Sequence, residues 1–277
     1  MTIFLFVLGA IVGSFLNVVI LRYNTGKGLS GRSQCFSCQT ELSWYELIPI
    51  VSFVLLRGRC RSCRSAISTQ YALVEVLTAV IFALTSFTLF PEGVIREDQV
   101  PEALLYLTIF SLLIVIFVYD LRHKIIPDGF VYAFSGISLL GMLTGITSHV
   151  NLTVGNVLAG PVFFLPFALL WLVSNGRWMG FGDAKLALGI GWFLGFMPGV
   201  VALLLSFYIG AAVGIVLMAL RRLLSHYSRG GNNSLFLSVK NLTMNGEIPF
   251  APFLIIGLWI VFFWDVSLVD VSSFGSW

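Results

Sequence analysis

Two aspartates stand at the ends of apolar stretches, where a charged side chain is unusual. Asp120 follows the apolar stretch 103–119, and Asp183 directly precedes another at 184–196. A charged group at the edge of hydrocarbon is costly, so such residues usually face a protein interior or a watery cavity. Two carboxylates that meet there could share one proton and activate a water molecule, which is the chemistry of aspartic proteases. Whether these two meet depends on the elements that carry them.

The composition is that of a membrane protein. The chain has 277 residues, of which 58% are hydrophobic and 10% are charged, whereas soluble domains carry about 25% charged residues. Apolar stretches close to the bilayer length of about 20 residues recur along the chain. We count eight: 2–21, 71–90, 103–119, 129–147, 154–173, 184–196, 200–220 and 250–264. We therefore expect an all-α polytopic membrane protein with about eight transmembrane helices.

The basic residues are concentrated in alternate loops. If the N-terminus lies outside, the cytoplasmic loops are 22–70, 121–128, 174–183 and 221–249. These loops and the adjacent Lys185 hold 15 of the 16 Lys and Arg residues, all except Arg96. Because Lys and Arg accumulate in cytoplasmic loops, this pattern predicts both termini outside and both aspartates at the cytoplasmic face.

The predicted organisation has three parts. Residues 1–22 form the first transmembrane helix, residues 23–70 form a cytoplasmic loop, and residues 71–277 form a membrane-embedded core. No internal repeat is apparent, which disfavours a transporter built from inverted repeats.

All four cysteines lie in the cytoplasmic loop as two Cys-x-x-Cys pairs separated by 21 residues. This spacing is typical of a zinc ribbon, in which each pair gives two thiolates to one tetrahedral ion. Disulfides are the alternative, and a reducing cytoplasmic location argues against them. Four thiolates leave no open position for water, so the predicted zinc is structural. Its ligands would be Cys35, Cys38, Cys60 and Cys63.

Three aspartates near helix ends differ in how well a structural role explains them. Asp120 lies at a helix C-terminus, where an acid opposes the helix dipole, so a functional role is favoured. Asp128 follows Pro127 and is expected to cap the next helix. Asp183 could likewise be a cap.

Two glycines precede Asp183, and a lysine follows it. Gly180 and Gly182 would allow close backbone approach and a positive φ just before a helix. Lys185 could hold a substrate carbonyl or extend to the membrane interface. Asp183 and Asp120 remain the candidate acid pair, because no serine-protease or metalloprotease motif occurs.

The motifs along the chain resemble those of the bacterial type IV prepilin peptidases, which are polytopic Gly-x-Gly-Asp aspartyl proteases. The matching segments are 13–20, the paired Cys-x-x-Cys motifs with Trp44-Tyr45 and Ile48-Pro49 between them, 56–60, 71–75, Asp120 with 126–128, 180–186 and 248–253.

The resemblance implies that Asp120 and Asp183 are the catalytic pair. It also implies a multi-pass protein of the bacterial inner membrane that removes basic leaders from prepilins or pseudopilins, as in type IV pilus and type II secretion systems. Many members also methylate the new N-terminus with S-adenosylmethionine, and the cysteine loop accompanies that activity. Gly58 is then a candidate contact for this cofactor, and Glu75 could hold the substrate amine or serve only in packing.

Three alternatives stay open. The protein could be a peptidase without methylation, a proton-coupled transporter that uses intramembrane acids, or a zinc-ribbon membrane scaffold. Membrane lipid is an expected partner, and nucleic acid is not.

Overall fold

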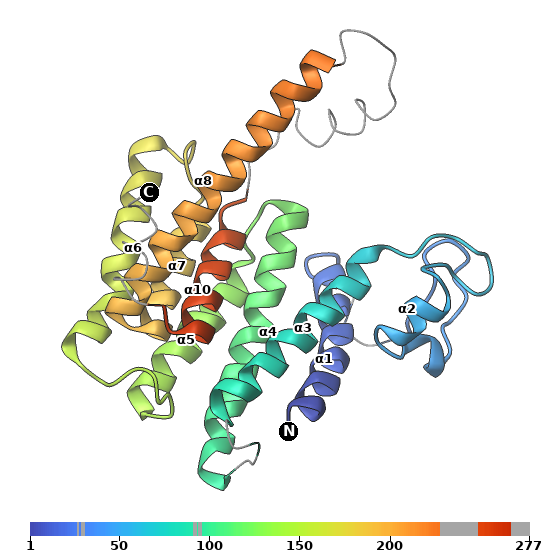
Figure 1. Ribbon diagram of the computed structural model, residues 1–277, viewed down its shortest axis with the longest axis horizontal. Helices are drawn as coiled ribbons and strands as arrows, with labels where there is room; N and C mark the ends of the chain where they lie inside the picture. Colours follow the sequence, from blue (N-terminus) through green and yellow to red (C-terminus); the bar gives the residue numbers. More distant parts are fainter. Residues whose placement is uncertain (27, 29–30, 91–92, 94–95, 228–248, 267–277) are drawn as a thin grey trace. The chain divides into compact units, whose positions relative to one another are not determined.

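Helices make up the regular structure of the computed structural model (Figure 1). It describes residues 1–26, 28, 31–90, 93, 96–227 and 249–266. Ile248 of the last matching segment and most of the loop 221–249 lie outside these residues. The described residues contain no β-strand, and only two isolated antiparallel bridges occur among them, Gln34–Glu41 and Arg59–Ala66. The predicted all-α class is confirmed.

Each predicted apolar stretch corresponds to one helix. The helices are α1 (Thr2–Arg22), α3 (Thr69–Leu89), α4 (Val100–His123), α5 (Asp128–Thr144), α6 (Val154–Ser174), α7 (Phe181–Leu194), α8 (Phe196–Tyr227) and α10 (Ala251–Trp264). Three short elements complete the described chain: η1 (Trp44–Leu47), α2 (Val51–Leu55) and η2 (Glu97–Gln99).

Five of these helical segments are long and apolar enough to cross a membrane. These segments are α1, α3, α6, the part of α8 from Phe196 to Leu220, and the continuous segment Glu97–His123, which joins η2 to α4. The other three, α5, α7 and α10, have 17, 14 and 14 residues. The chain is therefore a multi-pass membrane protein, and the total of eight spans stays a prediction.

The described residues form two compact units. Unit 1 comprises Met1–Tyr119 and Gly136–Ser148, and unit 2 comprises Asp120–Ser135 and His149–Trp277. Both candidate aspartates therefore belong to unit 2, whereas the four cysteines belong to unit 1.

In unit 1, glycines allow α1 and α3 to pack at backbone distance. A Cβ atom on Gly9 would lie 2.7 Å from the Thr78 carbonyl oxygen, and one on Gly13 would lie 2.8 Å from the Glu75 Cα. One turn further on, Asn17 Nδ2 donates to the Tyr71 carbonyl at 3.1 Å. Small residues and a buried amide are the usual means of joining helices where no hydrophobic effect drives them together.

In unit 2, α7 is surrounded by α6, α8 and α10. Nine of its fourteen residues are buried. A Cβ on Gly191 would lie 2.6 Å from the Ala159 backbone, so α6 and α7 also pack at backbone distance. The helix that carries Asp183 is therefore held on several sides.

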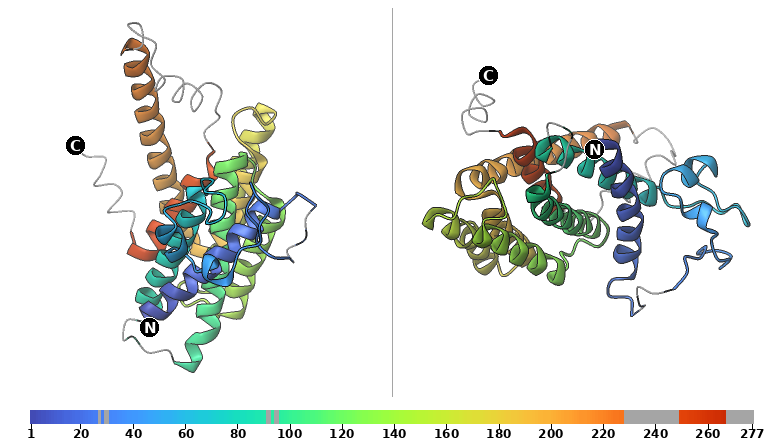
Figure 2. Two further views of the ribbon diagram at one scale, coloured as in Figure 1. Left: turned by 90° about the vertical axis from the view of Figure 1, so that its right-hand side faces the viewer. Right: turned by 90° about the horizontal axis from the view of Figure 1, so that it is seen from below.

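The junction between α7 and α8 is shorter than a typical turn. Gly195, with φ +78°, is the only residue between the two helices. Because a positive φ suits glycine, this single residue can join the two helices without a longer loop. Beyond the part packed on α7 and α10, α8 runs on as one long helix (Figures 1 and 2). Its apolar side chains there are exposed, for example Ile215 and Met218.

Candidate active site and candidate metal centre

Asp120 lies in the last turn of α4 and is buried, with 4% of its surface exposed. Its backbone carbonyl accepts a hydrogen bond from the Lys124 N–H at 2.7 Å, which closes the helix end. Its side-chain Oδ2 has no hydrogen-bond partner among the described residues. A buried carboxylate oxygen without a partner costs free energy, and helix formation does not require it here.

Asp183 is the third residue of α7 and is also buried, with 6% exposed. Gly180 occupies the N-cap position, so the alternative that Asp183 itself is the cap residue is wrong. The Asp183 carboxylate instead accepts a hydrogen bond from the Gly180 backbone N–H. Its Oδ1 has no partner within the described part of the chain. One oxygen thus supports the helix start, and the other remains available.

Packing around Gly182 brings the two acids to the same end of unit 2. A Cβ on Gly182 would lie 2.7 Å from the Ile126 Cβ, so the connection after α4 lies directly against the start of α7. Asp120 is close enough to Asp183 for its charge to act on that carboxylate. Buried carboxylates within electrostatic reach of each other disfavour the state in which both are ionised.

The two glycines before Asp183 do not have the backbone conformation that we predicted. Gly180 has φ −73°, and Gly182 is not among the residues with positive φ. The predicted close approach is found at Gly182 alone, because the ideal Cβ on Gly180 meets nothing nearer than 3.6 Å. Glycine is required at position 182 because a side chain there would collide with Ile126, and not because the backbone has a positive φ.

Lys185 and Asp128 form an ion pair beside the acids. The Lys185 Nζ lies 2.7 Å from the Asp128 Oδ1. It also lies 4.9 Å from the ring centre of Tyr132 and 5.0 Å from that of Phe181. Asp128 is the first residue of α5 rather than its N-cap, so that prediction was wrong by one position. Its carboxylate ties α5 to α7.

The four cysteine thiols of unit 1 form a cluster suited to a metal ion. Their Sγ atoms all lie within 4.8 Å of one another. Those of Cys35 and Cys63 are 3.8 Å apart, which matches a tetrahedral site whose metal–sulfur bonds are about 2.3 Å long. The predicted ligands are therefore brought together, and a zinc-ribbon-like loop is present.

The two Cys-x-x-Cys turns are near copies of each other. In each, the N–H of the first cysteine donates to the carbonyl five residues on, and the residue four positions on has a positive φ. The equivalent residues are Cys35 and Cys60, Gln39 and Arg64, and Thr40 and Ser65. We found no repeat in the sequence, although the shared pattern Cys-x-Ser-Cys followed by x-Thr or x-Ser was a signal for this one.

Hydrogen bonds to sulfur favour the thiolate form that binds metal. The backbone N–H groups of Cys38 and Ser37 lower the pKa of Cys35 to about 6. The Ser65 hydroxyl, 3.1 Å from the Cys63 sulfur, is the largest of the interactions that lower the pKa of Cys63.

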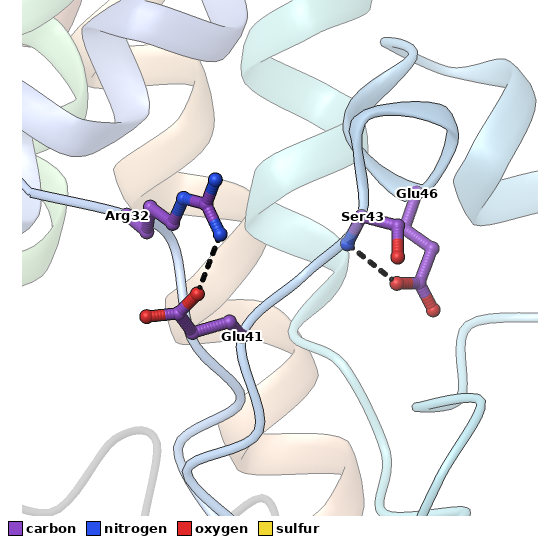
Figure 3. Close-up of polar contacts among 4 residues, drawn as sticks. All are labelled: Arg32, Glu41, Ser43 and Glu46. Carbon is purple, nitrogen blue, oxygen red and sulfur yellow. Dashed lines mark hydrogen bonds and ion pairs between the residues drawn. The ribbon is translucent and has the colours of Figure 1, made fainter.

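Polar contacts brace the loop beside these turns (Figure 3). Arg32 pairs with Glu41 at 2.8 Å, and the Ser43 N–H donates to the Glu46 carboxylate at 2.8 Å. The second contact completes a capping box at the start of η1.

Gly58 has a conformational reason to be glycine. Its φ is +66°, and a Cβ there would meet the Phe53 ring at 3.1 Å. Its N–H donates to the Phe53 carbonyl, and its own carbonyl accepts from the Ile67 N–H. These contacts explain Gly58 as a turn residue, and its role toward a cofactor stays a prediction.

Glu75 joins three segments of unit 1. It is 7% exposed, and its Oε2 accepts a hydrogen bond from the Ile50 N–H at 2.7 Å. The Ser14 hydroxyl of α1 donates to the same carboxylate. The packing role that we considered for Glu75 is therefore present, whereas binding of a substrate amine is untested.

Comparison with known proteins places the chain in a family of peptidases. Residues 7–89 match the bacterial peptidase A24 N-terminal domain, and residues 107–215 match the type IV leader peptidase family. The chain belongs to the type IV leader peptidase family.

Several relatives share much of the chain. The prepilin leader peptidase/N-methyltransferase of Aeromonas hydrophila is 31% identical over 95% of this chain and 90% of its own length. That of Myxococcus xanthus is 36% identical over 69% of this chain, but the match spans only 56% of the relative. The type 4 prepilin-like proteins leader peptide-processing enzyme of Escherichia coli is 32% identical over 66% of this chain and 73% of its own length. No solved structure matches significantly.

Gly182→Ala should lower the rate of leader cleavage and destabilise the protein by about 1–3 kcal/mol, because the added methyl group overlaps Ile126. Gly180→Ala is the matched control and should retain both properties, since its φ is ordinary and an added Cβ would make only ordinary contact, 3.6 Å from the Asp183 Oδ2. Cleavage of a prepilin and thermal unfolding in detergent measure the two effects. Equal losses in both variants would contradict the assigned contact.

A double-mutant cycle on Asp128→Ala and Lys185→Met should reveal coupling between α5 and α7. We expect a coupling free energy of about 1 kcal/mol in the unfolding measurements. The value is small because the Asp128 side chain is 63% exposed, and solvent screens its charge. Additive single effects would show that the ion pair does not tie the helices together.

Proposed function

We propose that this protein is a prepilin leader peptidase that uses Asp120 and Asp183 as its catalytic pair. One structural observation carries the assignment: two buried carboxylates lie at the same end of unit 2, and each has an oxygen without a partner among the residues that the structure describes. Membership of the type IV leader peptidase family and the names of the relatives support prepilins or pseudopilins as substrates.

In the proposed reaction, one aspartate is ionised and the other is protonated. The ionised carboxylate takes a proton from water as the water oxygen bonds to the scissile carbonyl carbon. The protonated carboxyl group donates to the carbonyl oxygen, which gains the electron pair of its double bond. When the tetrahedral intermediate collapses, the carbon–nitrogen bond breaks and the leaving amine takes the proton abstracted from water. The second carboxylate regains its proton from a hydroxyl of the intermediate as the new carboxyl group forms. Either residue can begin in either state, since they titrate as a pair.

We also propose that the cysteine cluster holds one structural zinc ion through Cys35, Cys38, Cys60 and Cys63. The sulfur separations and the lowered pKa values of the Cys35 and Cys63 thiols fit this ion, whereas the pKa of Cys60 is raised. Zinc would fix the geometry of a loop too small for a hydrophobic core of its own.

Methylation of the new N-terminus is proposed from the names of the relatives. S-adenosylmethionine would supply the methyl group to that amine. Gly58 does not present an open cradle for this cofactor, because the Phe53 ring lies against it. Gly58 therefore stays an untested candidate contact of S-adenosylmethionine, and a peptidase without methylation is the alternative.

The proposed setting is the bacterial inner membrane, with both termini outside and the aspartates at the cytoplasmic face. The distribution of Lys and Arg supports this orientation. The basic leader would then lie in the cytoplasm, and the apolar helix of the prepilin would lie in the bilayer.

Asp120→Asn and Asp183→Asn should each lower the rate of leader removal by about 10²- to 10⁴-fold or more, the usual range for loss of a general acid or base. Asp98→Asn, at an exposed acid in η2, is the control and should behave as wild type. Product mass after incubation with a prepilin measures cleavage and any added methyl group. A wild-type rate in either variant would remove that residue from the catalytic pair and favour a transporter or scaffold.

Purified protein should contain about one zinc ion per chain, as expected for a Cys₄ site. Cys35→Ser and Cys60→Ser should each lose the metal, whereas Ser37→Ala, at a residue between two of the ligands, should keep it. Metal analysis by mass spectrometry measures this. Metal-free wild-type protein with two disulfides would overturn both the zinc site and the cytoplasmic location of the loop.

A further inference from the structure

The segment between the two cysteine turns exposes an unusual amount of apolar surface. In η1, Trp44 is 77% exposed, and in α2, Val54 and Leu55 are 66% and 76% exposed. Tyr45, Leu47, Ile48 and Val51 are exposed as well. Contiguous apolar surface of this kind is rare on water-facing proteins and marks an interaction site.

The exposed residues of α2 share one face of the helix. Val51, Val54 and Leu55 follow the spacing i, i+3, i+4, which places side chains on one side. Phe53, between them in sequence, is less exposed and lies under Gly58. The segment η1–α2, residues 44–55, is therefore amphipathic, with one side held by the loop and the other uncovered.

A partly buried hydrogen bond fixes this segment beside a helix long enough to cross the membrane. Glu75, which accepts from the Ile50 N–H, lies six residues beyond Thr69, the first residue of α3. At 1.5 Å per residue, that is about 9 Å along the helix from its end. Ile50 has φ +63°, which is strained for a β-branched residue and needs such support. The Ile50–Glu75 hydrogen bond therefore holds η1–α2 beside α3 and not beyond the N-terminal end of that helix.

Positive charge adjoins the apolar surface. Arg57, Arg59, Arg61 and Arg64 are all exposed and follow the end of α2 within nine residues. The two nearby acids are already engaged, Glu41 by Arg32 and Glu46 by the Ser43 N–H (Figure 3). Arg61 additionally lies over the Tyr45 ring, with 5.3 Å to its centre. An apolar face bordered by arginines complements a leaflet of anionic phospholipid.

We propose that η1–α2 is an interfacial anchor that inserts its apolar face into the anionic leaflet beside α3, with the neighbouring arginines at the lipid phosphates. The anchor holds the cysteine cluster at a fixed height on the membrane surface. This inference depends on α3 being a membrane span and does not depend on the peptidase reaction.

The test uses the full chain in nanodiscs and isolates the fluorescence of Trp44 as the difference between wild type and Trp44→Phe. Lipids brominated near the headgroup and lipids brominated near the chain end act as membrane quenchers, and iodide acts as the aqueous quencher. Trp44 should be quenched most by the shallow lipid, at a depth of about 5–10 Å, and should be shielded from iodide.

Two further variants sharpen the test. Val54→Asn, on the exposed face, should increase quenching of Trp44 by iodide, whereas Ser52→Asn, on another face of α2, should not. Arg57→Gln combined with Arg59→Gln should remove any difference in depth between nanodiscs with and without phosphatidylglycerol.

Two results would overturn the proposal. Quenching by iodide without quenching by lipid would place the segment in water. Protection from both quenchers would show that protein, either a second copy or another partner, covers it instead of lipid.

Discussion

The burial of two carboxylates at one end of unit 2 is the constraint on which the rest of the site depends. Asp120 and Asp183 are both nearly excluded from solvent, and each has a carboxylate oxygen without a partner among the described residues. A low-dielectric environment makes the repulsion between two such charges severe unless they share a proton. The surrounding structure must therefore hold them together against this repulsion.

Several contacts hold the two carboxylates in place, and most of them are made by the backbone or by small residues. The absence of a side chain on Gly182 lets Ile126 lie on α7, and the Lys185–Asp128 pair ties α7 to the start of α5. Gly191 lets α6 approach α7 from another side. Tight packing is the means available in lipid, where apolar side chains gain little by leaving a solvent as apolar as themselves.

Unit 1 uses the same means and adds a metal-binding cluster. Gly9 and Gly13 join α1 to α3, and Glu75 connects both helices to the segment between the cysteine turns. The cluster and the buried acid therefore brace one loop from two directions. This explains how a loop without a core of its own can have a defined structure beside a membrane.

Much of this arrangement could be predicted from residue types and their order. Apolar length located the eight long helices of the described residues, and the cost of a charge near hydrocarbon singled out Asp120 and Asp183. The spacing of the cysteines identified the cluster that the structure brings together.

What could not be predicted depends on neighbours remote in sequence. The need for glycine at 182 arises from Ile126, and the partner of Glu75 is the backbone of Ile50. The one-residue error at Asp128 reflects a choice between Pro127 and Asp128 as helix start that local capping preference does not decide. The number of spans stays open because α5, α7 and α10 are short, and length alone does not assign them to the membrane.

The central claim is that Asp120 and Asp183 act as one unit, and the most direct test is the additivity of their loss. The rate of leader cleavage should be measured for Asp120→Asn, Asp183→Asn and the double variant under single-turnover conditions. If the pair shares one proton and one water, the double variant should be no slower than the slower single variant. Losses that multiply would show two independent contributions and would contradict the account.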